Sequence, residues 1–168
     1  VARRMVPDLL GAGCSLVDLD LSYFELSRTW SATFGEAAVC STVLRSLSLP
    51  DCKLQGPLPE LRLPALRVLD LSHNQCTGGL EPLRGCTGLQ RLSLQNNQLT
   101  GGLEPLRGCT ALVDLFLGNN QISGGLEPLR GCTALQGLFL ASNKLTGSLE
   151  PLKGCTALQE LIVDRPFS

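Results

Sequence analysis

A block of ten residues, GGLEPLRGCT, recurs every 23 residues along the second half of the chain. Identical copies occupy residues 78–87, 101–110 and 124–133, and a close copy, GSLEPLKGCT, occupies residues 147–156. Self-similarity at a fixed period of about 20–50 residues is typical of a solenoid, in which each repeat forms one coil. A solenoid has no globular centre, so the length of 168 residues counts coils rather than domains.

Within each period the apolar positions follow the pattern LxxLxLxxNxL. Its clearest copies are Leu89, Leu92, Leu94, Asn97 and Leu99; Leu112, Leu115, Leu117, Asn120 and Ile122; and Leu135, Leu138, Leu140, Asn143 and Leu145. This pattern resembles the leucine-rich repeat family over nearly the whole chain, and its LTG step is similar to plant-type and algal or protist repeats. The resemblance implies an α/β solenoid, a leucine-rich repeat horseshoe of about seven coils. It also implies a parallel concave sheet, with mostly turns and short 3-10 segments on the convex side.

We expect one leucine-rich repeat domain over residues 1–168. An N-terminal cap and a long first repeat would occupy 1–43, regular repeats 44–157, and the last strand and tail 158–168. The first period is longer because of the segment SRTWSATFGEAAVCSTV, residues 27–43, whose apolar spacing predicts one helix on the convex side. We expect Trp30 and Phe34 to fill the space behind this longer coil rather than to contact a partner.

Three polar columns follow from the period. We expect the asparagine column to satisfy backbone groups where the chain turns off each strand. A glutamate column and a basic column, three residues apart, are expected to form a solvated, mutually neutralised convex face. The members are Asn74, Asn97, Asn120 and Asn143; Glu81, Glu104, Glu127 and Glu150; and Arg84, Arg107, Arg130 and Lys153.

Four of the eight cysteines share one position in the period: Cys86, Cys109, Cys132 and Cys155. We interpret them as a column of buried, reduced thiols, the rival being disulfides between neighbouring coils. Reduced thiols favour an intracellular, reducing compartment, with an extracellular location as the alternative. There is no CxxC pair and His73 is the single histidine, so we expect no metal site.

The best functional signal lies among residues that alternate with the inward leucines. The residue between the second and third leucine is polar in the first four coils (Asp20, Ser48, Asp70, Ser93) and apolar in the last three (Phe116, Phe139, Ile162). The two phenylalanines should lie roughly 5 Å apart on adjacent strands, and exposed contiguous apolar surface usually marks a contact site. The predicted partner-binding residues are Phe116, Phe139, Ile162, Asp114, Arg91 and Glu160.

Two alternatives would cover this surface from within: the C-terminal tail with Phe167 folded back, or a continuation of the same chain. A second, weaker candidate is an acidic rim at the other end of the sheet that could receive a basic segment, although a solvated surface is the favoured interpretation there. That rim comprises Asp18, Asp20, Tyr23, Asp51, Asp70 and His73.

Catalysis finds no support, because no Ser–His–Asp or Cys–His pairing and no phosphate-binding glycine loop is present. We therefore predict no enzyme activity, no catalytic residue and no cofactor. A net charge of −1 and the lack of a long apolar run disfavour nucleic acid and membrane insertion. We expect a non-catalytic protein-binding or scaffolding module, a subunit or fragment of a larger assembly, whose partner is another protein and not a small-molecule substrate. The alternatives are an ectodomain fragment of a leucine-rich repeat receptor and a regulatory repeat domain of a larger enzyme.

Overall fold

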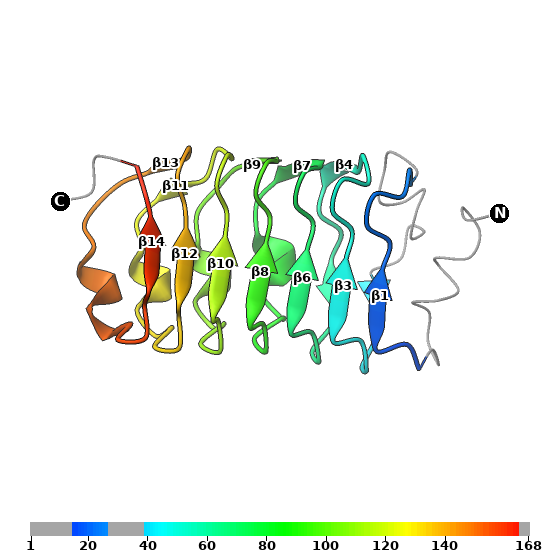
Figure 1. The fold of residues 1–168 in the computed structure, drawn as a ribbon, viewed down its shortest axis with the longest axis horizontal. Helices are drawn as coiled ribbons and strands as arrows, with labels where there is room; N and C mark the ends of the chain where they lie inside the picture. The colour runs from blue at the N-terminus through cyan, green and yellow to red at the C-terminus, as the bar shows by residue number, and fades with distance from the viewer. Residues whose placement is uncertain (1–14, 27–38, 165–168) are drawn as a thin grey trace.

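A computed structural model describes residues 15–26 and 39–164. Its main element is a seven-stranded parallel sheet with one strand from each coil (Figure 1). In order across the sheet, the strands are β1 (Asp18–Asp20), β3 (Ser46–Ser48), β6 (Val68–Asp70), β8 (Arg91–Ser93), β10 (Asp114–Phe116), β12 (Gly137–Phe139) and β14 (Glu160–Ile162). Because each strand pairs only with those of the neighbouring coils, the predicted leucine-rich repeat solenoid of about seven coils is confirmed.

The strands stack in a constant register set by the repeat. Leu92 faces Leu115 across the sheet, and Leu115 faces Leu138, each 23 residues further along the chain. Each strand is centred on the second leucine of the motif and includes one residue on either side of it. Side chains on either side of that leucine therefore point to the solvent face of the sheet, which we call the concave face.

Short parallel strands also run along the other edge of the coils. They form a three-stranded sheet of β4 (Gln55–Pro57), β7 (Gln75–Gly78) and β9 (Gln98–Leu99), and the pair of β11 (Ser123–Gly124) with β13 (Lys144–Leu145). A separate pair joins β2 (Val39–Cys40) with β5 (Leu61–Arg62). The expectation of mostly turns missed these strands. The helix expected over 27–43 is wrong at its described end, where Val39 and Cys40 form β2; its remainder, Trp30 and Phe34 included, lies outside the described residues, as does the expected cap over residues 1–14.

Behind the main sheet, four short 3-10 helices stack on one another: η1 (Glu81–Leu83), η2 (Glu104–Leu106), η3 (Glu127–Leu129) and η4 (Glu150–Gly154). Each has a proline in its first turn, where the missing N–H costs no hydrogen bond. Their leucines turn inward, and Leu83, Leu106 and Leu129 are fully buried. The predicted convex 3-10 segments are therefore confirmed.

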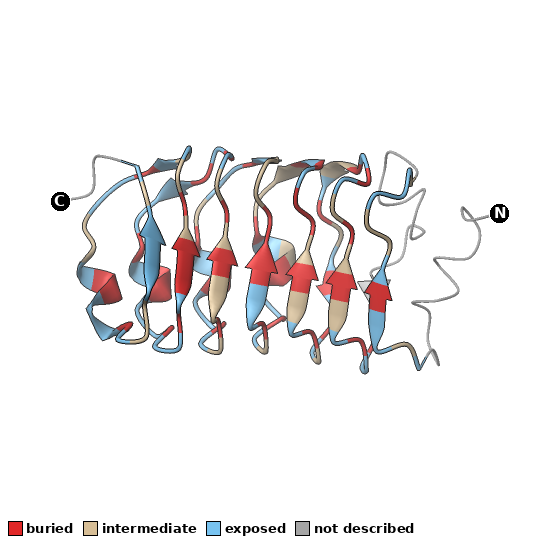
Figure 2. Ribbon diagram, viewed as in Figure 1, coloured by how far each residue is buried: buried red, intermediate tan, exposed pale blue. Residues whose placement is uncertain are grey.

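The core is a narrow strip of leucine between the sheet and these helices (Figure 2). Leucines of the second and third motif positions, such as Leu115 and Leu117, are 0% exposed in the middle coils. Burial ends abruptly at β14, where all three residues are exposed and Leu161 reaches 37%. The last described coil lacks the neighbour that covers every earlier one.

The asparagine column links each coil to the coil before it. Asn120 is buried, its Oδ1 accepts the Leu99 N–H at 3.0 Å, and its Nδ2 donates to the carbonyls of Leu94 and Leu117 at 2.9 and 3.0 Å. Asn74, Asn97 and Asn143 make the same kinds of bonds. The expected structural role is confirmed, since these amides satisfy backbone groups that the turn leaves without partners.

The cysteine column is also buried and unpaired. Cys52 and the four cysteines of the column, Cys86, Cys109, Cys132 and Cys155, are free thiols. Within the column, the Sγ atoms of Cys109 and Cys132 each lie 3.5 Å from the carbonyl oxygen of the cysteine one coil earlier. Burial raises the pKa of the Cys109 and Cys132 thiols to about 11.

This burial predicts a loss of stability at alkaline pH. Above about pH 8.5 the thiols ionise in the unfolded chain, whereas in the folded chain Cys109 and Cys132 keep their protons until about pH 11. The unfolded state then binds fewer protons, so the unfolding free energy should fall as pH rises through this window. Urea unfolding at several pH values measures the slope. A Cys109→Ala, Cys132→Ala variant should show a shallower dependence, and an identical slope would contradict the assignment.

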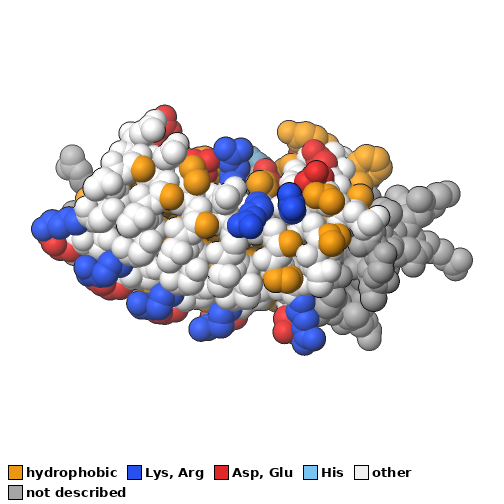
Figure 3. All heavy atoms as spheres, turned by 90° about the horizontal axis from the view of Figure 1, so that it is seen from below, with side chains coloured by type: hydrophobic (Ala, Val, Ile, Leu, Met, Phe, Trp, Pro, Cys, Tyr) orange, Lys and Arg blue, Asp and Glu red, His pale blue; other side chains and the backbone are white. Residues whose placement is uncertain are grey.

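On the convex face, three of the four expected charge pairs form ion pairs. The distances are 2.8 Å for Arg107–Glu104, for Arg130–Glu127 and for Lys153–Glu150. All six side chains are well exposed, and charged side chains of both signs recur along one edge of the molecule in Figure 3. Exposed pairs of this kind contribute little to stability, which fits the expected neutralised, solvated surface.

Candidate functional site

Three apolar side chains lie in one row on the concave face, and we call Phe116, Phe139 and Ile162 the apolar patch. Register places Phe116 beside Phe139, and Phe139 beside Ile162. The two rings have centroids 4.8 Å apart and are tilted by 32°, which confirms the separation predicted from the strand spacing. Both rings are half-buried, while Ile162 is 49% exposed. Tilted, offset rings at this distance attract each other.

Small residues beside the rings keep the patch open. Gly137 and Gly118 flank it on the strand side and on the turn side. A Cβ atom at Gly137 would lie 2.9 Å from Asp114 Oδ1 and 3.3 Å from Phe139 Cε2, both closer than normal packing allows. The Phe139 ring edge and the Asp114 carboxylate therefore lie over Gly137, and a larger residue there would have to displace them.

An ion pair borders the patch. Arg91 on β8 donates from Nε to Asp114 Oδ2 on β10 at 3.0 Å, and its Nη2 lies 3.0 Å from the same oxygen. The Asp114 side chain is 18% exposed and that of Arg91 61%, so the carboxylate is held in place while the guanidinium faces solvent. Glu160 lies in the same row as Asp114, two strands away, and is exposed. All six predicted partner-binding residues therefore share one surface of four adjacent strands, and their role in binding stays a prediction.

The acidic rim predicted at the other end of the face is held by local hydrogen bonds. Asp20 accepts hydrogen bonds from the backbone and hydroxyl of Ser22, which lower the pKa of the Asp20 carboxyl. Asp70 Oδ1 accepts the Ser72 N–H at 2.9 Å in the same way. Tyr23, a member of this rim, is 75% exposed. These carboxylates thus help to form the turns that follow their strands.

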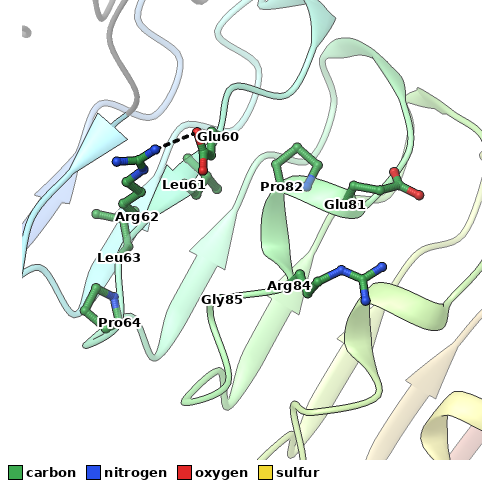
Figure 4. A pocket seen from close by; sticks show the side chains of 9 residues that line it. All are labelled: Glu60, Leu61, Arg62, Leu63, Pro64, Glu81, Pro82, Arg84 and Gly85. Carbon is green, nitrogen blue, oxygen red and sulfur yellow. Dashed lines mark hydrogen bonds and ion pairs between the residues drawn. The ribbon is translucent and has the colours of Figure 1, made fainter.

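An open hollow of about 410 Å³ lies at the convex side (Figure 4). It is lined by Glu60, Leu61, Arg62, Leu63, Pro64, Glu81, Pro82, Arg84 and Gly85. The hollow forms where a proline-rich return arm, which makes no 3-10 helix, meets the coil that contains η1. Glu60 pairs with Arg62 at 3.2 Å, and in Figure 4 the charged ends of Glu81 and Arg84 point away from that pair. Without polar groups converging on it, the hollow is a weaker candidate than the concave face. Sequence reasoning missed it, although the change from PLPELRL to GGLEPLRG marks the place.

Residues 15–26 and 39–164 offer no site of two further classes. No group of three or more His, Cys, Asp or Glu side chains in these ranges could hold a metal ion. None of the helices found there has the length and apolar character needed to cross a bilayer.

Comparison with known families agrees with the repeat pattern. A profile for two copies of "Leucine Rich repeats" matches residues 87–131, and a "Leucine Rich Repeat" profile matches residues 65–86. No curated protein sequence matches the chain significantly.

Several solved structures share the fold. The ectodomain of the plant membrane receptor kinase GASSHO1/SCHENGEN3 from Arabidopsis thaliana, in complex with CASPARIAN STRIP INTEGRITY FACTOR 2, is 29% identical with a TM-score of 0.78. The Arabidopsis receptor kinase HAESA, in complex with the peptide hormone IDA and the co-receptor SERK1, is 25% identical with a TM-score of 0.73. An internalin, InlF from Listeria monocytogenes, is 27% identical with a TM-score of 0.73.

These alignments include most of this chain and a minor part of each relative. They cover 88%, 94% and 88% of this chain, but 18%, 31% and 41% of the GASSHO1/SCHENGEN3, HAESA and internalin chains. The chain therefore spans less than half the length of each of them. Its repeats match both profiles and its fold matches all three structures, and the chain belongs to the leucine-rich repeat family.

Proposed function

We propose that this chain is a non-catalytic protein-binding module that contacts its partner through the concave face, with the apolar patch at the centre of the contact. The observation that carries this proposal is the stacked pair Phe116–Phe139 on the solvent side of the sheet. The leucines that precede them on the same strands, Leu115 and Leu138, are fully buried. Aromatic side chains that lie on a contiguous apolar surface are the usual anchors of protein interfaces. The rigid sheet holds the patch in one geometry before the partner arrives.

The class of partner is supported by the relatives. HAESA was solved with a peptide hormone and a co-receptor protein, and GASSHO1/SCHENGEN3 with CASPARIAN STRIP INTEGRITY FACTOR 2. We infer that this chain likewise binds a peptide or a protein segment, as an ectodomain-type module. This inference favours the receptor-fragment alternative of the sequence analysis over a scaffold subunit.

A second candidate is an intracellular adaptor, which is favoured by one observation. Cys52 and the four cysteines of the column are free thiols, and free thiols are commonest in reducing compartments. Titration of thiols in the unfolded chain separates the two candidates. Eight free thiols would favour the adaptor, whereas a disulfide between Cys14 and Cys40, whose side chains lie outside the described part, would favour the ectodomain.

Removal of both rings tests the proposed contact. Phe116→Ala with Phe139→Ala should weaken binding of a purified partner by at least about tenfold, because anchor residues typically contribute about 2 kcal/mol or more. The unfolding free energy should fall by only about 1–2 kcal/mol, since the rings are half-buried and lose mainly their mutual contact. Affinity capture identifies the partner, and isothermal titration calorimetry with the purified protein measures the change.

The matched control removes two exposed aromatic residues at the other end of the solenoid. Tyr23 and Phe24 are 75% and 55% exposed, and Tyr23→Ala with Phe24→Ala should leave the affinity unchanged. Equal affinity for wild type and the Phe116/Phe139 variant would refute the proposed contact. A large drop in stability of that variant would show that the rings are part of the core.

A further inference from the structure

The three strands that carry the apolar patch contain carboxylates and no basic residue. These strands and their flanking positions cover residues 113–119, 136–142 and 159–164, and none of these is Lys or Arg. Three are acidic: Asp114, Glu160 and Asp164. Among the described residues, the cation that pairs with this set is Arg91, which is bound to Asp114.

Glu160 and Asp164 differ from the convex glutamates in their ion pairs. Glu104, Glu127 and Glu150 each form an ion pair with the basic residue three positions later. Glu160 is exposed and forms no ion pair within the described part of the chain. Asp164 is also exposed, and its Oδ2 accepts one hydrogen bond, from the Asn143 N–H at 3.2 Å.

The other end of the concave face has a different charge pattern. There Arg45 and Arg67 directly precede β3 and β6, close in sequence to Asp51 and Asp70. Both signs are therefore present around the first strands, whereas the last three strands combine apolar and acidic side chains only. Among the described residues, the exposed carboxylates of Glu160 and Asp164 are therefore the charges next to the apolar patch that no cation neutralises, although the whole chain has a net charge of only −1.

The spacing of these groups defines what can bind. Along β14, Glu160 and Ile162 lie on the same face, about 6.7 Å apart by the strand rise. Asp164 lies beyond Ile162 at the end of the strand, so carboxylates lie on both sides of the apolar row. When one side chain of the partner contacts the patch, the partner residues one or two positions away lie over Glu160 and Asp164. This follows because alternate residues of an extended segment are also about 6.7 Å apart.

From this arrangement we propose that the segment bound at the concave face is cationic and apolar: a large apolar side chain with Lys or Arg one or two positions away on at least one side. This inference rests on the proposed function and specifies its partner. The apolar side chain contacts Phe116 and Phe139, and the cations pair with Glu160 and Asp164. Asp114 adds little, because Arg91 already neutralises it.

Selection from a library of displayed random dodecapeptides tests the proposal. The library is panned separately on the wild-type chain, on Phe116→Ala/Phe139→Ala and on Glu160→Gln/Asp164→Asn. Asn at position 164 keeps an oxygen for the Asn143 N–H, so the second variant removes charge with little structural change. We expect the wild-type pool to be enriched in an apolar residue with Lys or Arg within two positions. The charge variant should lose the bias for Lys and Arg, and the ring variant should lose the enrichment altogether.

One selected peptide is then titrated by fluorescence anisotropy. Glu160→Gln/Asp164→Asn should weaken its binding about two- to tenfold at low salt, the range expected for two exposed ion pairs. The difference should shrink at high salt as the charges are screened. The matched control is Glu127→Gln, a convex glutamate far from the sheet face in the fold, which should leave the affinity unchanged.

The possible results separate the two proposals. Ring-dependent peptides without a bias for Lys or Arg, or with a bias for Asp and Glu, would overturn the cationic partner and leave the concave contact standing. Selected peptides that bind wild type and the ring variant equally would overturn the proposed function, and this inference with it. Ring-dependent, salt-sensitive, cationic peptides would support both.

Discussion

Substitution of Asn120 by alanine is expected to lower the free energy of unfolding by about 3–5 kcal/mol. Its amide oxygen accepts the Leu99 N–H, and its amide nitrogen donates to the carbonyls of Leu94 and Leu117. These groups are buried between coils. Each buried group left without a partner costs about 1–3 kcal/mol, and the affected groups belong to two successive coils. Equilibrium urea unfolding followed by circular dichroism measures the loss.

Two further substitutions separate the hydrogen bonds from the turn itself. Asn120→Asp keeps an oxygen for Leu99 but places a negative charge against two carbonyl oxygens, so at neutral pH it should be at least as damaging as alanine. Part of that loss should be recovered at acidic pH, where a protonated carboxyl can donate again. Asn119→Gly is the control: Asn119 is exposed, and its φ of 57° suits glycine. A loss of less than about 1 kcal/mol for Asn120→Ala would show that water can replace the amide.

The role of Asn120 could be predicted from the sequence because a constant repeat places equivalent residues directly above one another. The same reasoning predicted the separation of Phe116 and Phe139, which depends only on the strand spacing. It also predicted that the thiol of Cys109 is buried and that Glu104 and Arg107 pair on the convex face. In each case the period alone fixes the neighbours, so no knowledge of side-chain packing is needed.

Features that depend on the contact between two particular coils could not be predicted in this way. The short strand β9 contains two residues, Gln98 and Leu99, too few to show the alternation that identifies a strand. It forms because β7, the equivalent strand of the preceding coil, offers backbone hydrogen-bond partners in register. The hollow beside Pro82 arises for a similar reason, since it depends on a mismatch between two unlike coils.

The candidate site lies where the residue type in the concave row changes from polar to apolar. Along the concave row, serine at position 93 gives way to phenylalanine at 116, although the inward leucines continue unchanged. The inward leucines are unaffected by this change, because Leu92 and Leu115 are equally buried. The sequence therefore locates the surface that differs from coil to coil. It does not identify the partner, because the partner's chemistry depends on the individual side chains around the rings and not on the repeat.

The second large effect is expected for Leu115→Ala, which should cost about 2–5 kcal/mol. Leu115 is 0% exposed at the centre of β10, between two coils that cover it on both sides. Truncation removes three side-chain carbons and leaves a cavity that the rigid stack of coils cannot close. Urea unfolding of wild type and variant, analysed with a common m-value, measures the difference.

The same change at Leu161 provides the matched control, because Leu161 occupies the equivalent motif position in β14. It is 37% exposed where Leu115 and Leu138 are 0%, so its truncation should cost less than about 1.5 kcal/mol. In a solenoid each coil is stabilised mainly by its neighbours, and a terminal coil with one neighbour contributes less than a central one. Equal losses at Leu115 and Leu161 would show that the end of the sheet at β14 is covered in solution. A loss at Leu161 that grows with protein concentration would attribute that cover to a second copy of the chain.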